Sequence, residues 1–390
     1  MTPEQRAVNT IKCLGMDAVQ QANSGHPGMV MGMAEIATVL WSDFVKYDPN
    51  DAHWMDRDRV VLSNGHGSML LYAALHLSGQ SISLEDIKQF RQWGAVTAGH
   101  PEYGYADGIE TTTGPLGQGF ANGVGMAMAE RWLRENVSTD LVDHYTYVMC
   151  GDGCLMEGVS AEAASLAGHL KLGKMIVLYD DNNITIDGRT DLAFGEDVCA
   201  RFEAYGWQTM RIDGHDKDAI RAAIQAGKDN ADQPTMIACK TIIAKDSPNK
   251  ADTSSAHGSP LGEEEIRAVK TAIGMNPDEK FVVHDDAYAH FRRRHTEMSA
   301  EREAWNQKVA ASESGAKLLG YHEAPDTSAV DWPVFEEGGS IATRSSSHKV
   351  LTAIAAGIPN FIGGSADLAG SNKTKLAGGD CSRESFVGRN

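Results

Sequence analysis

The sequence predicts an α/β protein with a doubly wound, mostly parallel sheet that carries helices on both faces, followed by the start of a second α/β domain. Short apolar segments alternate with helical stretches from the N-terminus to about residue 240. The apolar segments have the length of strands, and the stretches between them can hold crossover helices. With 390 residues, 42% of them hydrophobic, the chain can bury more than one core.

The first predicted element is a helix at the N-terminus. Thr2 can cap this helix, Pro3 suits its first position, and Gln5 completes the spacing of a capping box. Five later segments have the composition of strands, namely residues 59–63, 145–150, 174–180, 207–213 and 235–241. Helices are expected between them, among others over residues 118–134, 156–170 and 196–205.

The C-terminal third of the sequence predicts the domain organisation. Residues 245–262 are rich in Ser, Pro and Gly and predict a loop, after which residues 263–315 have a helical pattern. We expect one domain over residues 1–320, a linker over 321–340 and the beginning of a second domain over 341–390. That last part should supply a helix and a short strand at FIGGS (361–365). Because these cannot bury enough apolar surface to offset the ordering entropy, we expect it to be mobile or disordered.

Composition excludes several classes of partner. The net charge of −18 argues against nucleic acid and against an anionic membrane surface. No apolar stretch has the length of a membrane-spanning helix. The six cysteines form no CxxC pair and no secretory signal precedes them, which favours a reduced, cytoplasmic protein.

The stretch VMCGDGCLMEG (148–158) places Asp152 between two glycines where a buried strand ends. The next strand ends in DDNNITIDG (180–188), so Asp152 and Asn182 should meet at the same edge of a parallel sheet. Their oxygens suit Mg²⁺, although both stretches could also be ordinary polar turns, with Asp152 capping a helix. A calcium loop of the EF-hand kind is excluded, because its fifth and sixth positions would be Ile184 and Thr185.

Two further patterns point to a ligand site. In GPLGQGFANG (114–123) the glycines miss the dinucleotide-binding spacing by one residue, which leaves a glycine-rich turn that opens a helix. Four histidines lie in loops that contain Gly or Pro, where they could exchange protons near neutral pH rather than fill a core: His26, His66, His100 and His257.

Gly-Asp-Gly at residues 151–153, followed by Asn-Asn at residues 182–183, resembles the signature of thiamine-diphosphate enzymes. Further stretches resemble motifs of the transketolase family, in family order and along the whole chain. They are NSGHPGMVMGMAEIATVLW (23–41), VLSNGHGSMLLYAALHLSG (61–79), GHPEYGYADGIETTTGPLGQGFANGVGMAMAE (99–130), HGSPLG (257–262), ATRSSSHKVL (342–351) and GGSADLAGSN (363–372).

The resemblance implies roles for individual residues. It implies a divalent metal, Mg²⁺ or a substitute such as Ca²⁺, on Asp152, Asn182 and the backbone carbonyl of Ile184. It implies contacts with thiamine diphosphate from His66, Gly114, Pro115, Leu116, Gly153, Asn182, Ile186 and His257. His26, His100 and His257 would bind substrate and act in catalysis, and Arg344 and Ser371 would bind its phosphate. His348 and Gly370 depart from the residues common in the family, and Asp367 matches an acid near the cofactor ring.

The function implied is transketolase chemistry in the pentose phosphate pathway. A two-carbon ketol unit would pass between sugar phosphates in a cytoplasmic homodimer with active sites at the subunit interface. Two alternatives stay open, a dihydroxyacetone synthase-like transferase and a non-catalytic cofactor-binding module. The family's activating glutamate lies in a motif that we expect just beyond Asn390, so we expect this chain to be inactive alone.

Overall fold

The computed structural model describes residues 1–390, which form two compact units. Unit 1 comprises residues 1–128 and 144–302, and unit 2 comprises residues 129–143 and 303–390. These units divide the chain at other places than the expected domain boundaries near residues 320 and 340, which stay a prediction.

Unit 1 is built on a sheet of five parallel strands in the order β1-β2-β3-β5-β4. Each predicted strand segment forms a strand, within one residue at either end: β1 (Arg59–Leu62), β2 (Thr146–Gly151), β3 (Met175–Asp181), β4 (Gln208–Asp213) and β5 (Thr235–Lys240). The predicted α/β class with a parallel sheet is therefore confirmed.

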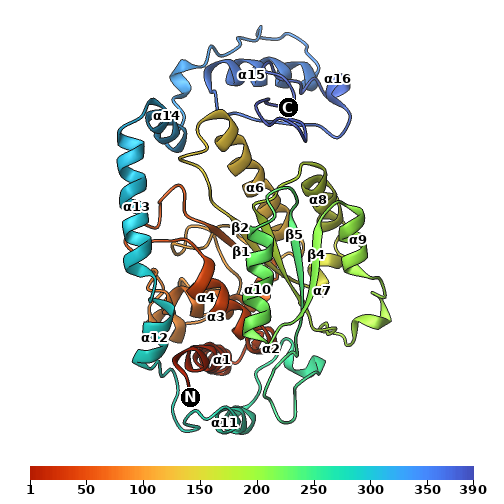
Figure 1. Ribbon diagram of the computed structural model, residues 1–390. Helices are drawn as coiled ribbons and strands as arrows, with labels where there is room; N and C mark the ends of the chain where they lie inside the picture. Colours follow the sequence, from red (N-terminus) through yellow and green to blue (C-terminus); the bar gives the residue numbers. More distant parts are fainter. The chain divides into compact units, whose positions relative to one another are not determined.

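Helices cover both faces of this sheet. Tyr147 and Met149 of β2 belong to one core, together with residues of α10 (Lys217–Lys228), which lies in front of the strands in Figure 1. Val148 points to the opposite face, where a Cβ at Gly123 of α6 (Gln118–Asn136) would lie 2.4 Å from its side chain. Because successive side chains of a strand point to opposite faces, both sides of β2 are buried under helices.

The helices of unit 1 keep most of the predicted positions. Thr2 caps α1 by accepting a hydrogen bond from the Gln5 backbone N–H at 3.2 Å. The helix expected over 156–170 is interrupted at Glu157, whose backbone is extended. The bounds are α1 (Pro3–Ala22), α2 (Pro27–Gly32), α3 (Ala34–Val39), α4 (Ser68–Leu77), α5 (Leu84–Lys88), α7 (Asp152–Met156), α8 (Gly158–His169), α9 (Val198–Ala204), α11 (Glu263–Ala272) and α12 (Asp285–Phe291), while α6 and α13 (His295–Ala310) have residues in both units.

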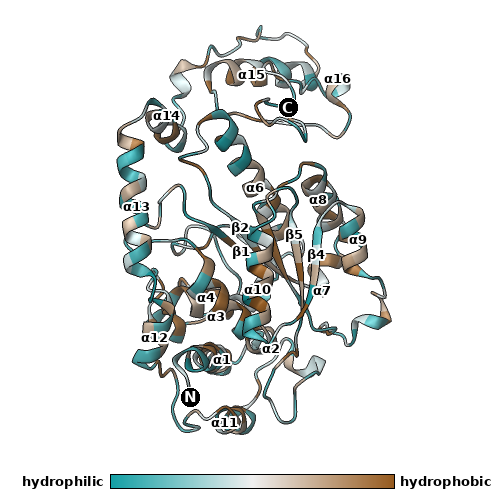
Figure 2. Ribbon diagram, in the orientation of Figure 1, coloured by the Kyte–Doolittle hydropathy of each residue, from teal (hydrophilic) through white to brown (hydrophobic).

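Burial distinguishes β4, one of the two edge strands, from the rest of the sheet. Every residue of β2 is buried, whereas β4 at the sheet edge is half-buried or exposed along its length. Figure 2 shows the same contrast, with the central strands mainly brown and β4 largely teal. None of the helices combines the length and the apolar character needed to cross a bilayer.

Unit 2 contains helices but no strand. Besides its parts of α6 and α13 it contains α14 (Glu313–His322), α15 (Thr343–Gly357) and α16 (Ala369–Asn372). The predicted strand at FIGGS is wrong, because no second strand is present to pair with it. Instead the Gly363 N–H donates to the carbonyl of Arg389 at 2.9 Å.

The C-terminal residues also differ from the expected disorder. The Arg389 guanidinium donates to backbone carbonyls of Ala355 and Phe361, at 2.6 and 3.0 Å. Phe386 is fully buried, and the Trp132 indole donates to the carbonyl of Gly388 at 2.8 Å. These contacts lie within unit 2, and they give residues 341–390 a defined packing without the strand that we expected.

Candidate functional site

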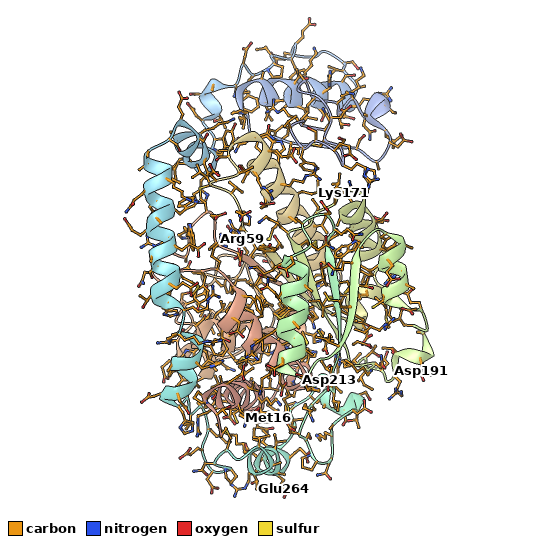
Figure 3. The ribbon with its side chains drawn as sticks, viewed as in Figure 1. Met16, Arg59, Lys171, Asp191, Asp213 and Glu264 are labelled. Atoms are coloured by element: carbon orange, nitrogen blue, oxygen red, sulfur yellow. The ribbon has the colours of Figure 1, made fainter.

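The candidate site is a cleft at the carboxyl ends of β2 and β3. Gly151 pairs with Asp180 in the parallel register, so the residues that follow both strands lie at one edge. Figure 3 shows the direction of the strands, with Arg59 at the start of β1 and Asp213 at the end of β4. The cleft has about 560 Å³ of empty space, partly open to solvent. It is lined by Met29, Asn64, His66, Leu116, Gly151, Asp152, Gly153, Cys154, Asp180, Asn182, Ile184, Thr185, Ile186, Ile243 and His257.

Asp152 begins α7 and is 4% exposed. Its Oδ1 accepts a hydrogen bond from the Tyr179 hydroxyl at 2.5 Å, and its Oδ2 accepts one from the Asn183 backbone N–H at 3.2 Å. Burial raises the pKa of Asp152 to about 6, although these two donors oppose the shift. A nearby cation would favour the charged form of this carboxylate.

The second part of the oxygen cluster follows β3. The Oδ1 of Asn182 accepts from the backbone N–H of Ile184 at 2.8 Å, and its amide nitrogen donates to Asp180 at 2.8 Å. Burial raises the pKa of Asp180 to about 7, and Thr241 donates a hydrogen bond to this carboxyl. No group of three or more His, Cys, Asp and Glu side chains is arranged to hold a metal. A metal at this edge would therefore need amide and backbone oxygens as well as Asp152.

The four loop histidines predicted from the sequence come together. The His26 ring centroid lies 5.0 Å from that of His66, 6.4 Å from that of His100 and 5.6 Å from that of His257. The rings of His66 and His257 are 4.9 Å apart. Burial lowers the pKa of all four, that of His26 to about 4 with help from the neighbouring positive groups. The rings are therefore neutral at pH 7, and each can donate at one nitrogen and accept at the other.

Two polar atoms of the cleft lack a partner. The Nδ1 of His257 and the Oδ1 of Asn64 are buried and form no hydrogen bond, and both residues line the cleft. Since buried polar atoms are nearly always paired, these two indicate that the cleft receives a polar ligand.

Of the residues predicted in the glycine-rich turn, only Leu116 lines the cleft. A Cβ at Gly153 would lie 2.9 Å from Cδ1 of Leu116. Gly114 has a φ of +140° and lies against the ring of His100, to which a Cβ would come within 3.1 Å. Ile186 lines the cleft although it is 63% exposed, whereas Pro115 is exposed and is absent from the lining.

No sequence pattern indicated Arg91 as a site residue. Its guanidinium donates to the Ser24 hydroxyl at 2.7 Å, and Nη2 lies 3.4 Å from Nδ1 of His26. Arg91 has a φ of +61°, which is uncommon for a residue with a side chain. Only the fold reveals this contact, because 65 residues separate Arg91 from His26.

The two predicted phosphate ligands belong to unit 2. Arg344 lies in the first turn of α15 and Ser371 in α16, and both side chains are exposed. Asp367 is exposed too and has a φ of +57°. The roles of these three residues stay predictions.

Comparison with known proteins gives consistent matches along the chain. Residues 3–322 match a family model described as "Transketolase, thiamine diphosphate binding domain". The transketolase of Geobacillus stearothermophilus is 50% identical, with 99% of this chain and 60% of the relative covered, and that of Bacillus subtilis is 48% identical, with 100% and 60% covered. The solved transketolase structures from Campylobacter jejuni and Leishmania mexicana superpose with a TM-score of 0.94 at 43% and 44% identity. Both superpositions cover 100% of this chain and 60% of the solved chain. The chain thus spans about 60% of the length of these relatives.

Proposed function

The chain belongs to the transketolase family, and on this premise we propose that its cleft binds thiamine diphosphate through a divalent cation. The proposed ion is Mg²⁺, for which Ca²⁺ or another divalent ion can substitute. Its proposed ligands are the Asp152 carboxylate, the Asn182 amide oxygen and the Ile184 carbonyl. The chemistry of this donor set supports the proposal, because Mg²⁺ prefers oxygen ligands and completes its shell with water and phosphate oxygens.

The residues around the cleft suit the rest of the cofactor. We assign the diphosphate to His66, His257 and the backbone of Gly153. Gly114, Pro115, Leu116 and Ile186 are the proposed contacts of the two rings. The unpaired His257 Nδ1 supports a polar ligand here, and so does the unpaired Oδ1 of Asn64. When bound, thiamine diphosphate supplies an electron sink for a two-carbon unit.

For the complete protein we propose the transfer of a two-carbon ketol unit from a ketose phosphate to an aldose phosphate in the pentose phosphate pathway. His26, His100 and His257 would bind sugar hydroxyls and move protons, which suits their lowered pKa values. Arg344 and Ser371 are the proposed phosphate ligands. The transketolase of Pichia stipitis was solved in complex with sedoheptulose 7-phosphate and, as a mutant, with xylulose 5-phosphate, which supports this substrate class. A cytoplasmic homodimer with active sites at the subunit interface belongs to the same proposal.

The observation that carries this proposal is the convergence of Asp152, His66 and His257 on one cleft. The ring of His26 lies beside those of both cleft histidines, and His100 lies beside His26. Calorimetric titration of the chain with thiamine diphosphate tests the cofactor site. Binding should be strong with Mg²⁺ and weak after chelation, and equal affinity in both conditions would contradict the metal-bridged arrangement. In the complete protein, transfer from xylulose 5-phosphate should be faster when ribose 5-phosphate is the acceptor than when formaldehyde is the acceptor. A preference for formaldehyde would favour the dihydroxyacetone synthase-like alternative.

A further inference from the structure

We propose that Lys12 is a positioning residue for the histidine cluster, because its buried ammonium group holds the chain segment that leads to His257. This segment, residues 242–257, connects β5 to the loop before α11 and is called the 242–257 segment below. The inference rests on the proposed function, since the cluster is assigned there to cofactor and substrate.

Lys12 forms two ion pairs inside unit 1. Its side chain on α1 is 1% exposed, and Nζ lies 2.8 Å from Oε1 of Glu35 on α3 and 2.8 Å from Oδ2 of Asp246 in the 242–257 segment. Burial lowers the pKa of Lys12, but the two carboxylates outweigh this effect and raise it above the ordinary value. The side chain is therefore a permanent cation that joins α1, α3 and the segment.

His215 holds the start of the same segment. Its Nδ1 lies 3.4 Å from Oε2 of Glu35, and its Nε2 accepts a hydrogen bond from the backbone N–H of Ile242 at 3.0 Å. Glu35 thus interacts with both Lys12 and His215, and through them it fixes the segment at Ile242 and at Asp246.

The backbone of the segment needs such support. Ala244, Asp246 and Asp252 have φ values of +52°, +74° and +57°, a region that favours glycine. Residues with a side chain persist there only where their surroundings impose the conformation. For Asp246 the ion pair with buried Lys12 provides that constraint. The carboxylate of Asp252 is exposed and lies 3.8 Å from the guanidinium of Arg189, while its backbone N–H donates to the carbonyl of Ile243 at 3.0 Å. The side chain of Asp252 therefore contacts no buried cation.

The segment lies directly against the helix that follows His26. The N–H of Ala244 donates to the carbonyl of Gly28 on α2 at 2.9 Å. A Cβ at Gly28 would lie 2.5 Å from the carbonyl oxygen of Ala256, so the two backbones touch. Since Pro27 begins α2, a displacement of the segment changes the separation of His257 from His26, whose ring centroids are 5.6 Å apart.

Asp246→Gly tests the inference, with Asp252→Gly as the matched control. Both variants replace an aspartate of positive φ in the same segment by glycine, but only the first removes a partner of a buried cation. Two properties of the cofactor-free chain are measured. One is the pKa of His257, followed by NMR on histidine-labelled protein and assigned with His257→Gln. The other is the rate of tryptic cleavage between Lys250 and Ala251, divided by the rate for a peptide of residues 243–257 with the same sequence, because Asp252 lies close to the cleaved bond.

We expect Asp246→Gly to raise the pKa of His257 toward the ordinary histidine value, because a looser segment exposes the ring to water. Cleavage at Lys250 should accelerate at least about tenfold, which corresponds to about 1.4 kcal/mol. Asp252→Gly should match the wild type in both measurements. Lys12→Met should reproduce the effects of Asp246→Gly, and Lys12→Arg should largely restore the wild-type values.

Equal behaviour of the two glycine variants would overturn the inference. Faster cleavage with an unchanged His257 pKa would overturn it too, because the ion pair would then hold the segment without positioning the ring. If Lys12→Met does not fold, the comparison of the two glycine variants still decides. Both measurements are made without cofactor, so absence of cofactor binding in the wild type would count against the proposed function alone.

Discussion

Replacing Gly153 by alanine should separate cofactor binding from stability. Gly153 is the second residue of α7, and its φ is not positive, so its backbone accepts alanine. The added Cβ would lie 2.9 Å from Cδ1 of Leu116, nearer than ordinary van der Waals contact. Leu116 is only partly buried, so its side chain can move, and the direction open to it is the cleft.

The expected magnitudes follow from this geometry. Overpacking of this kind costs about 1–3 kcal/mol. Alanine within a helix recovers up to about 1 kcal/mol relative to glycine, so the free energy of unfolding should fall by no more than about 3 kcal/mol. If Leu116 moves into the space of the cofactor, the same overpacking cost appears in binding. The Kd for thiamine diphosphate in the presence of Mg²⁺ should then rise about 5- to 150-fold.

Calorimetric titration measures the Kd, and urea unfolding measures the stability of the same samples. Gly125→Ala on α6 is the control, because a Cβ there meets nothing within 4 Å and should only add about 1 kcal/mol of helix stability. A Kd for Gly153→Ala equal to that of the control would refute the assignment of Gly153 and Leu116 to the cofactor site.

Three further predictions concern metal, substrate and pH. Asp152→Ala should abolish the Mg²⁺ dependence of cofactor binding in calorimetry, whereas Asp191→Ala, at a side chain that is 74% exposed, should preserve it. In the complete protein Arg344→Ala should raise the KM for phosphorylated substrates with little change in kcat, and an unchanged KM would remove Arg344 from the phosphate site. Burial, followed by the charge of Arg59, lowers the pKa of His144 to about 4, so below pH 6.5 the unfolded chain binds the proton better than the folded chain does. Stability should fall from pH 6.5 to pH 4 by about 3 kcal/mol through this group, and urea unfolding of His144→Gln should show a correspondingly shallower fall.

The sequence determined the sheet and one half of the site. Four of the five strands of unit 1 are short apolar runs between helical stretches, which is a local signal, whereas β4 at the sheet edge is mostly polar. Asp152 and Asn182 follow two such runs directly, and consecutive parallel strands that pair must bring them to one edge. The sequence also indicated the four loop histidines, because glycine and proline around them exclude a core face. Their meeting in one cluster was implied only by family resemblance.

Tertiary structure alone decided the contacts between residues that lie far apart in the chain. The neighbours of Arg91 and Lys12 are 23 to 234 residues away, and no pattern of periodicity or spacing encodes such pairs. The same limit explains the wrong strand at FIGGS. An apolar run predicts a strand only if a partner strand lies beside it, and here the backbone of Gly363 pairs with the C-terminal Arg389 instead. Local sequence sets what a segment can form, but hydrogen-bond partners and burial, which depend on the whole fold, set what it does form.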